Sequence, residues 1–221
     1  MRKALVTGAS RGIGKAVAEQ MRLEGYEVYT PSRAELDLED RLSVESYCIR
    51  CSDLAFDVLV NNAGINEPGQ IDAISEQEML SMVEINLLAP LRLTKALVLN
   101  MKKNHYGRIV NIGSIWGMAG KAGRVVYAAT KHAIHGVTQT LAVELAPYNI
   151  LVNTVCPGFT LTDLTWRNNS KEQIQQIVSS IPAGRMADPS EPAKLVCFLA
   201  GEHNTYITGQ QIAVDGGYTS V

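Results

Sequence analysis

Tyr127 and Lys131 lie four residues apart in the segment YAATKHAI. In a helix this spacing places both side chains on one face, about one turn apart. A phenol with a pKa of about 10 is a sluggish acid or base near neutral pH, and an adjacent ammonium lowers that pKa by stabilising the phenolate. The pair therefore indicates an acid–base group suited to a carbonyl and its alcohol, although an exposed pair on a helix surface has the same spacing.

A glycine-rich turn near the N-terminus suggests a nucleotide site. The segment TGASRGIG places Gly8, Gly12 and Gly14 between a short apolar run and a helical pattern. Glycine lets a backbone approach a ligand closely, and the unpaired N–H groups at a helix N-terminus suit a pyrophosphate. The spacing differs from the G-x-G-x-x-G fingerprint, and three glycines in a purely structural turn are the alternative. The turn predicts the first crevice of a dinucleotide-binding fold.

Continuous apolar runs alternate with helical patterns along the chain, which is typical of a parallel sheet covered on both faces. We therefore expect a doubly wound α/β fold. The strands expected are Lys3–Thr7, Glu27–Thr30, Val58–Asn61, a run ending near Ile112, ILVNTVCPG and QQIAVDGG. The helices expected follow the glycine turn as far as Gly25, cover Ser75–Asn104 with a division at Pro90, cover VVYAATKHAIHGVTQTLAVELA, and cover about Glu172–Ser179. The polar region 159–189 is expected to form a lid.

The composition limits the classes of protein. The chain has 221 residues, 46% of them apolar, and a formal charge of −2, which fits one α/β domain over residues 1–221 without a broad basic field for nucleic acid or membrane. It shows neither a signal-peptide core nor an apolar run of about 20 residues, so a cytoplasmic protein is expected. Cys48 and Cys51 form a C-x-x-C with no second pair at zinc spacing. We interpret them as helix residues and expect no metal.

Several motifs together resemble the short-chain dehydrogenase/reductase family. The glycine turn, NNAG at Asn61–Gly64, Ser114, the Tyr127–Lys131 pair and PG at Pro157–Gly158 occur in the family's order and spacing, and the match continues to YITGQQIAVDGG. Within the family the chain is most similar to 3-oxoacyl-[acyl-carrier-protein] reductases and related carbonyl reductases. The resemblance implies a Rossmann fold and an NAD(P)-dependent oxidoreductase.

The resemblance also implies roles for individual residues. Tyr127 would protonate the carbonyl oxygen as hydride arrives, Ser114 would hydrogen-bond the same oxygen, and Lys131 would hold the nicotinamide ribose. Asn86 would hold a water in a proton relay behind Lys131. Structural alternatives are that Ser114 only ends a strand and that Asn86 is a helix kink or a satisfied core amide. The other cofactor contacts implied are Gly8, Ser10, Arg11, Gly12, Ile13, Gly14, Ser32, Arg33, Asp37, Leu38, Asn62, Ala63, Gly64, Pro157, Gly158 and Thr160.

The end of the second strand favours NADP over NAD. An acidic residue there would bind a ribose 2′-hydroxyl, but this chain has YTPSR, with Ser32 and Arg33 in its place and Arg11 in the glycine turn. A guanidinium pairs well with a phosphate, although either arginine could simply point into water. Asp37 matches the family position that meets the adenine amino group, with Leu38 beside it.

The chain departs from its relatives after this strand. Only the six residues Pro31–Leu36 separate Thr30 from Asp37. A parallel crossover needs about a dozen residues, so no helix fits there. We expect six strands, with the family's outermost strand and helix missing, and Arg33–Leu38 running along the carboxyl edge of the sheet.

The substrate and the partners are less defined. Trp116 is expected to border the substrate pocket, and Lys121 and Arg124 near its mouth could grip a carboxylate or a carrier phosphate, or remain solvated. A small carbonyl or alcohol, possibly carrier-bound, is the expected substrate. A reductase of a polar keto substrate such as a sugar derivative, a nucleotide-sugar epimerase or dehydratase, and a non-catalytic NADP-binding protein are the alternatives. The helix around Val126–Ala146 is apolar on most sides, and family members pair such helices across a two-fold axis, so a homotetramer is expected.

Overall fold

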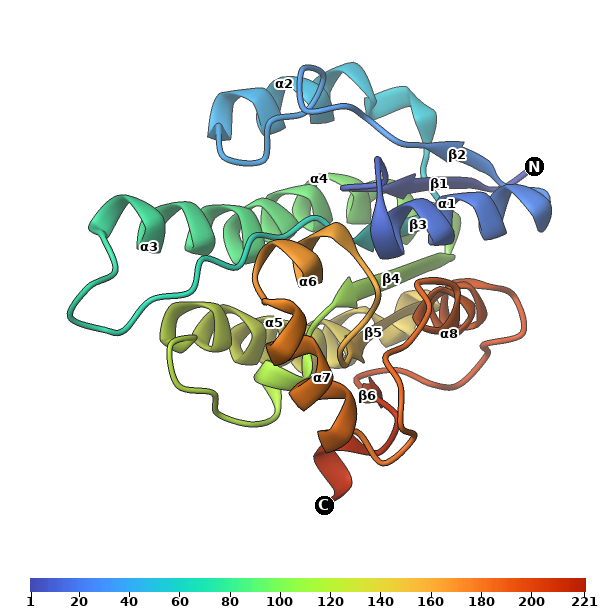
Figure 1. The fold of residues 1–221 in the computed structure, drawn as a ribbon. Coiled ribbons are helices and arrows are strands. Elements are labelled where there is room, and N and C mark those ends of the chain that lie inside the picture. Colours follow the sequence, from blue (N-terminus) through green and yellow to red (C-terminus); the bar gives the residue numbers. More distant parts are fainter.

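The computed structural model describes all 221 residues, which are arranged around one parallel sheet (Figure 1). Its strands are β1 (Lys3–Val6), β2 (Glu27–Tyr29), β3 (Val58–Asn61), β4 (Gly107–Ile112), β5 (Ile150–Pro157) and β6 (Gln211–Val214). They pair in the order β2-β1-β3-β4-β5-β6, and every pairing is parallel. The predicted six-stranded Rossmann sheet is confirmed.

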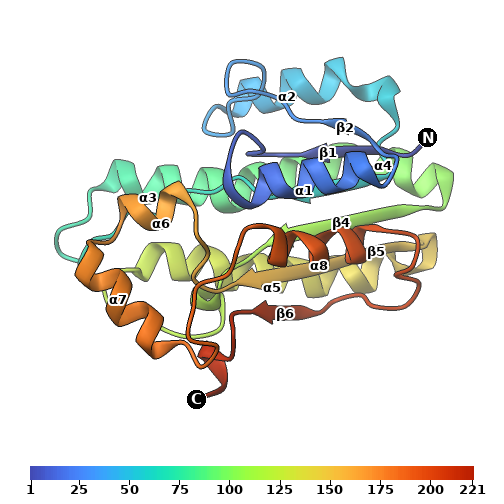
Figure 2. The same cartoon turned by 45° about the vertical axis from the view of Figure 1, so that its right-hand side comes forward.

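Helices cover both faces of this sheet (Figure 2). On one face α1 (Gly12–Leu23) packs beside α8 (Ser190–Ala200), while α2 (Arg41–Arg50), α4 (Ala89–Asn104) and α5 (Val125–Leu145) cover the other. Successive residues of a strand point to opposite faces. Leu5 and Leu59 therefore lie in the core under α4 and α5, and Val6 and Val60 lie in the core under α1 and α8.

The helix predicted over Ser75–Asn104 is interrupted before Pro90, not by it. It begins at α3 (Glu76–Val83), which has a capping box between Ser75 and Glu78, continues through a π-helical segment at Glu84–Leu88, and ends as α4. Pro90 lies in the first turn of α4, where a missing N–H costs little. A π-helical turn of this kind often marks a functional position, and this one contains the buried Asn86.

β2 is an edge strand that pairs only with β1, so the predicted loss of an outer strand is confirmed. The chain passes from β2 through turns to α2, and within them Leu36 is buried against the core. Asp37 is held by a hydrogen bond from its N–H to Ser43 Oγ (2.9 Å). Cys48 lies within α2 and Cys51 at its C-terminal end, both as free thiols, as their interpretation as helix residues requires.

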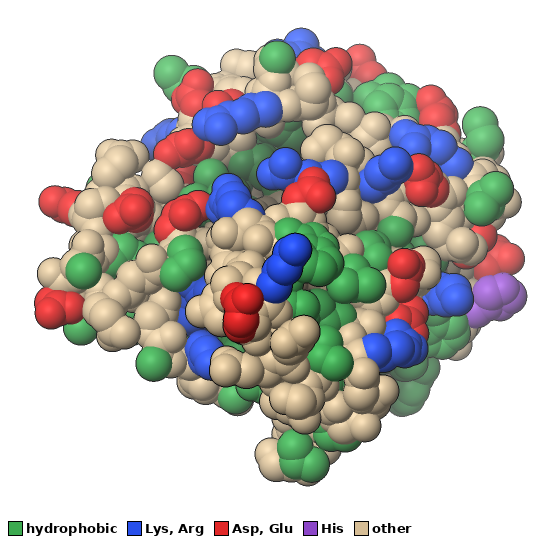
Figure 3. Space-filling model, in the orientation of Figure 1, with side chains coloured by type: hydrophobic (Ala, Val, Ile, Leu, Met, Phe, Trp, Pro, Cys, Tyr) green, Lys and Arg blue, Asp and Glu red, His purple; other side chains and the backbone are tan.

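The region predicted as a lid contains two helices. α6 (Asp163–Arg167) and α7 (Lys171–Ser180) lie at the carboxyl edge of the sheet, as Figure 2 shows. α7 matches the predicted short helix, whereas α6 and α8 had no individual prediction. No helix is long and apolar enough to cross a bilayer. Acidic and basic side chains are interspersed over the face in Figure 3.

Candidate active site

The site forms where the sheet changes direction. The chain leaves β1 toward β2, while β3 lies on the other side of β1, which opens a crevice at their carboxyl ends. The turn after β1 and the turn after β3 are in contact there. Gly8 has φ of +65°, and a Cβ on it would lie 2.8 Å from the Cα of Ala63. A Cβ on Gly14 would lie 2.3 Å from Asn62 Nδ2, so neither glycine tolerates a side chain.

Hydrogen bonds fix these two turns to each other. Thr7 Oγ1 accepts from the N–H groups of Asn62 and Ala63, both at 3.1 Å. The Asn62 carboxamide donates to the carbonyls of Thr7 (2.9 Å) and Gly8 (3.0 Å). No side chain caps α1, so the N–H groups of its first turn remain open to a ligand. The two turns form a preformed cradle for an anionic group.

A cleft of about 520 Å³ lies beside this cradle. Its wall also includes Leu164, together with Thr162 and Asp163, which were not predicted individually; all three come from the region 159–189 that was predicted to form a lid. Ser114 lines the cleft, and so does every residue that the sequence assigned to the cofactor: Gly8, Ser10, Arg11, Gly12, Ile13, Gly14, Ser32, Arg33, Asp37, Leu38, Asn62, Ala63, Gly64, Tyr127, Lys131, Pro157, Gly158 and Thr160. Asn86 does not line it.

Tyr127, Lys131 and Ser114 meet at the inner end of the cleft. Tyr127 and Lys131 lie one turn apart on α5, with Lys131 Nζ 5.6 Å from the centre of the Tyr127 ring. Lys131 is buried, and its Nζ donates to the carbonyl oxygen of Ile112 (2.7 Å) at the end of β4. Ser114 follows β4, and its Oγ accepts from the N–H of Trp116 (3.1 Å). The C-terminal end of β4 and the first turns of α5 thus bring the three groups together.

Burial governs the ionisation of this group. It raises the pKa of Tyr127, which a hydrogen bond with Ser114 and the charge of Arg124 only partly oppose. Burial also lowers the pKa of Lys131 to about 8. The expected lowering of the Tyr127 pKa below its ordinary value is therefore wrong for the chain by itself. Burial destabilises the phenolate by more free energy than the Ser114 hydrogen bond and the Arg124 charge restore.

Asn86 lies beside Gly64 and Lys131. Its Oδ1 accepts from the N–H of Ile65 (2.9 Å), and its Nδ2 donates to the Ile65 carbonyl (2.9 Å) and to Thr130 Oγ1 (3.2 Å). A Cβ on Gly64 would lie 3.1 Å from Asn86 Oδ1 and 3.5 Å from Lys131 Nζ. Asn86 is thus a satisfied buried amide that ties the turn after β3 to α5, and its predicted water relay stays a prediction.

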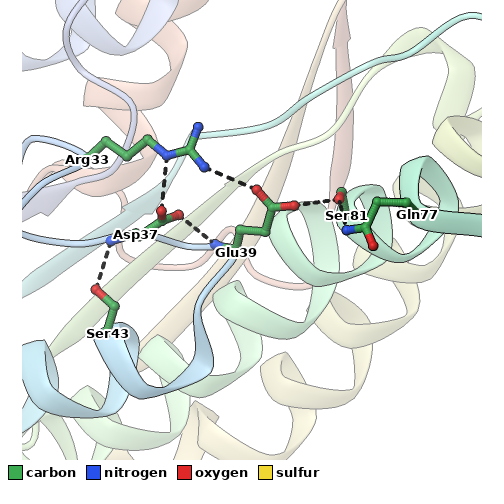
Figure 4. Close-up of polar contacts among 6 residues, drawn as sticks. All are labelled: Arg33, Asp37, Glu39, Ser43, Gln77 and Ser81. Carbon is green, nitrogen blue, oxygen red and sulfur yellow. Dashed lines mark hydrogen bonds and ion pairs between the residues drawn. The ribbon is translucent and has the colours of Figure 1, made fainter.

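The arginines predicted to favour NADP are largely exposed, and each lies beside a carboxylate of the chain. Arg33 donates from Nε to Asp37 Oδ2 and from Nη2 to Glu39 Oε2, both at 3.1 Å (Figure 4). Arg11 lies 3.9 Å from an oxygen of Asp163 on α6. The sequence analysis did not anticipate these contacts, because Glu39 and Asp163 belong to no motif of the nucleotide site and Asp37 was assigned to the adenine.

An aromatic cluster and two cations lie close to Ser114 and Tyr127, outside the lining of the cleft. Trp116, Phe159 and Tyr218 form an edge-to-face cluster with ring centres 5.3 to 6.0 Å apart. Arg124 Nη1 is buried without a hydrogen-bond partner, and its guanidinium stabilises the ionised form of Tyr127. Lys121 Nζ lies 5.8 Å from the Trp116 ring centre. This region places an aromatic cluster and one unpaired guanidinium nitrogen near Tyr127.

The sheet order, the glycine cradle and the cleft beside it define a dinucleotide-binding enzyme. A family model described as enoyl-(acyl carrier protein) reductase matches residues 34–219. The 3-oxoacyl-[acyl-carrier-protein] reductase FabG of Vibrio cholerae is 39% identical over 234 residues, which cover 97% of this chain and 96% of the relative. The chain belongs to the short-chain dehydrogenase/reductase family and is an NAD(P)-dependent oxidoreductase.

Solved structures agree with this assignment. A gluconate 5-dehydrogenase from Burkholderia cenocepacia, in complex with NADP and tartrate, superposes with a TM-score of 0.89 at 27% identity, covering 100% of this chain and 96% of that one. A 4-hydroxyisoleucine dehydrogenase complexed with NADH reaches a TM-score of 0.94 at 26% identity, covering 100% of both chains. The two neighbours carry different nicotinamide cofactors on the same fold.

The low pKa of Lys131 predicts a pH limit on carbonyl reduction. Lys131 loses its charge as the pH rises through about 8, while Tyr127, whose pKa is raised, stays protonated there. Because kcat/KM reports ionisations of the free enzyme, we expect kcat/KM to fall above pH about 8. Lys131→Arg stays charged, so its residual activity should show no such decline. A wild-type profile that is flat through this range would contradict the expectation.

Proposed function

We propose that the protein interconverts a ketone and a secondary alcohol, with NADP(H) as hydride carrier and Tyr127 as general acid and base. The observation that carries this proposal is the convergence of Tyr127, Ser114 and Lys131 on the cleft that all the predicted cofactor residues line. The cradle at Gly8 and Gly14, which a side chain would fill, suits a pyrophosphate. When bound, the nicotinamide supplies or accepts the hydride.

The chain's own residues would position the carbonyl and move its proton. Ser114 and Tyr127 hydrogen-bond the carbonyl oxygen, and Tyr127 donates its proton to that oxygen. Lys131 uses one N–H on the Ile112 carbonyl and has the others for a ribose hydroxyl. Its charge, together with that of an oxidised nicotinamide, opposes the burial that raises the Tyr127 pKa. Asn86, fixed behind Lys131, would hold the relay water.

A 3-oxoacyl thioester, free or carrier-bound, is the substrate class that the FabG relatives support. The aromatic cluster of Trp116, Phe159 and Tyr218 offers an apolar surface to an acyl chain. A second candidate is a keto or hydroxy acid. The buried, unpartnered Nη1 of Arg124 favours it, because a carboxylate would satisfy that nitrogen. A gluconate 5-dehydrogenase among the structural neighbours is consistent with it.

Tyr127→Phe tests the chemistry. The variant removes the proton donor and keeps the ring, so turnover should fall by at least about two orders of magnitude while NADPH binding persists. The measurement is NADPH oxidation across a panel of 3-oxoacyl thioesters, keto acids and keto sugars. The parent's preferred member also separates the two substrate candidates. Near wild-type turnover of the variant on that member would refute the role of Tyr127, and a parent inactive on the whole panel would refute the reductase.

Arg33→Asp tests the cofactor. A charge-assisted bond from Arg33 to the 2′-phosphate should give the parent a preference for NADPH over NADH of about tenfold in kcat/KM. An aspartate there would repel the phosphate and accept from a ribose hydroxyl, and the preference should vanish or reverse. Arg41→Asp, an equal charge change on α2 outside the cleft lining, should leave the preference intact. Equal use of both cofactors by the parent would sink the NADP assignment.

Assembly into a homotetramer is a further part of the proposal. The sheet-facing side of α5 carries Ile134, Ala142 and Leu145, whereas Val143 and, on α4, Leu99 are 80% and 70% exposed. Light scattering at micromolar concentration should give four times the 24.0 kDa chain mass. Val143→Glu should reduce that mass, because a charge would be buried at the helix interface. A monomer mass for the parent would contradict the assembly.

A further inference from the structure

Each group that could hold a 2′-phosphate at the rim of the cleft is paired with a carboxylate of the chain itself. Arg33 contacts Asp37 and Glu39, as Figure 4 shows. Arg11 lies near Asp163 of the lid. The N–H and the Oγ–H of Ser32 both donate to Glu35. A bound phosphate would therefore have to displace or share acidic partners, not fill a free site.

Glu35 occupies Ser32 in the way a phosphate oxygen would. Its Oε2 accepts from the Ser32 N–H and from the Ser32 hydroxyl, both at 2.8 Å. These two bonds lower the pKa of Glu35, so the side chain is ionised at neutral pH. Arg50, from the end of α2, donates to the Glu35 backbone carbonyl (2.9 Å) and not to its carboxylate. The hydrogen bonds of the Glu35 carboxylate therefore come from Ser32.

Glu39 is the second carboxylate that binds Arg33, in addition to Asp37. One carboxylate oxygen takes Arg33 Nη2, and the other accepts from the hydroxyl of Ser81 on α3. The Glu39 N–H donates in turn to Asp37 Oδ1 (3.0 Å). Arg33 thus binds two carboxylates, and one of them, Glu39, is also hydrogen-bonded to Ser81 on α3. Its single positive charge faces two negative ones.

We propose that Glu35 and Glu39 are specificity-determining residues that compete with the 2′-phosphate for Ser32 and Arg33 and so restrain the preference for NADPH over NADH. The inference rests on the proposed cofactor site, because it takes Ser32 and Arg33 as the phosphate contacts. A 2′-hydroxyl carries no charge and does not suffer this competition. The two acids therefore penalise the phosphorylated cofactor selectively.

A structural role for Glu35 is separable from this one. Ser32 and Glu35 have the spacing of a capping box and one of its two bonds, from the Ser32 N–H to the Glu35 carboxylate, and the turn is closed by a bond from the Leu36 N–H to the Ser32 carbonyl (2.9 Å). Glutamine serves the same box, because its carbonyl oxygen also accepts from Ser32. Glu35→Gln thus removes the charge and keeps the turn. Glu39→Gln removes the charge, keeps one acceptor oxygen for Arg33, and has an amide NH2 that can donate to the Ser81 hydroxyl oxygen.

The test compares ligands that differ only by the 2′-phosphate. Adenosine 2′,5′-bisphosphate and AMP isolate the adenosine end of the site from catalysis, and NADPH and NADH complete the set. Calorimetry should show that Glu35→Gln and Glu39→Gln each strengthen binding of the 2′-phosphorylated ligands by about three- to tenfold, with AMP and NADH changed by less than about twofold. In about 1 M salt, where the screening length is about 3 Å, the gain should largely disappear.

Glu45→Gln is the matched control. Glu45 is an exposed acid on α2 that pairs with Arg41 and does not line the cleft. Glu45→Gln changes the net charge by the same amount as the two test variants. Because Glu45 lies away from the cleft, the ratio of the affinities for phosphorylated and unphosphorylated ligands should stay as in the parent. Thermal melts of all variants confirm that each is folded.

The outcomes separate the inference from the proposed cofactor. If the parent favours the bisphosphate but neither variant alters that ratio, or all ligands change together, the role of Glu35 and Glu39 is wrong and the cofactor site stands. If the parent shows no preference and the variants create one, the two acids act as proposed and the NADP assignment is wrong. If neither the parent nor any variant distinguishes the ligands, the NADP assignment and the role of Glu35 and Glu39 are both wrong.

Discussion

The site depends on two backbone turns being brought into contact where the sheet changes direction. The turn after β1 and the turn after β3 approach so closely that Gly8 and Gly14 leave no space for a Cβ. Thr7 and Asn62 hold this approach through four hydrogen bonds between a side chain and the backbone. Because these turns are fixed, the start of α1 and the ends of β3 and β4 face one cleft. A side chain larger than hydrogen at Gly8 would push the turn after β1 away from the turn after β3.

A second constraint is the burial of an ammonium. Lys131 is 4% exposed, and the protein gives it one hydrogen bond, to the Ile112 carbonyl. An ammonium has three N–H groups, so this arrangement leaves donor capacity directed at the cleft at the cost of a lowered pKa. The π-helical segment that contains Asn86 supports the same region, because Asn86 fixes the backbone beside Gly64 and Lys131. A fully satisfied lysine here would be more stable but would have less capacity to bind a ligand.

The sequence predicted most of the fold and the lining of the cleft, because both follow from short-range signals. Apolar runs, glycine spacing and the Tyr127–Lys131 pair are readable residue by residue, and the short Pro31–Leu36 segment correctly excluded a crossover helix. What the sequence did not predict depends on three-dimensional neighbours. The direction of the Tyr127 pKa shift was wrong because burial outweighs the adjacent charge. The partners of Arg33 were missed because Glu39 and Ser81 meet only in the fold.

The missing outer unit explains why acids gather at the rim of the cofactor site. The chain must turn from β2 into α2 within eleven residues, Thr30–Asp40, and it satisfies exposed backbone N–H groups of that turn with its own carboxylates. Glu35 accepts from the N–H of Ser32, Asp37 from that of Glu39, and Asp40 from that of Leu42 at the start of α2. A longer crossover would satisfy such groups within a helix. The shortened loop therefore places structural carboxylates beside Arg33, the residue proposed to bind the 2′-phosphate, and this links the proposed cofactor preference to the stability of the loop.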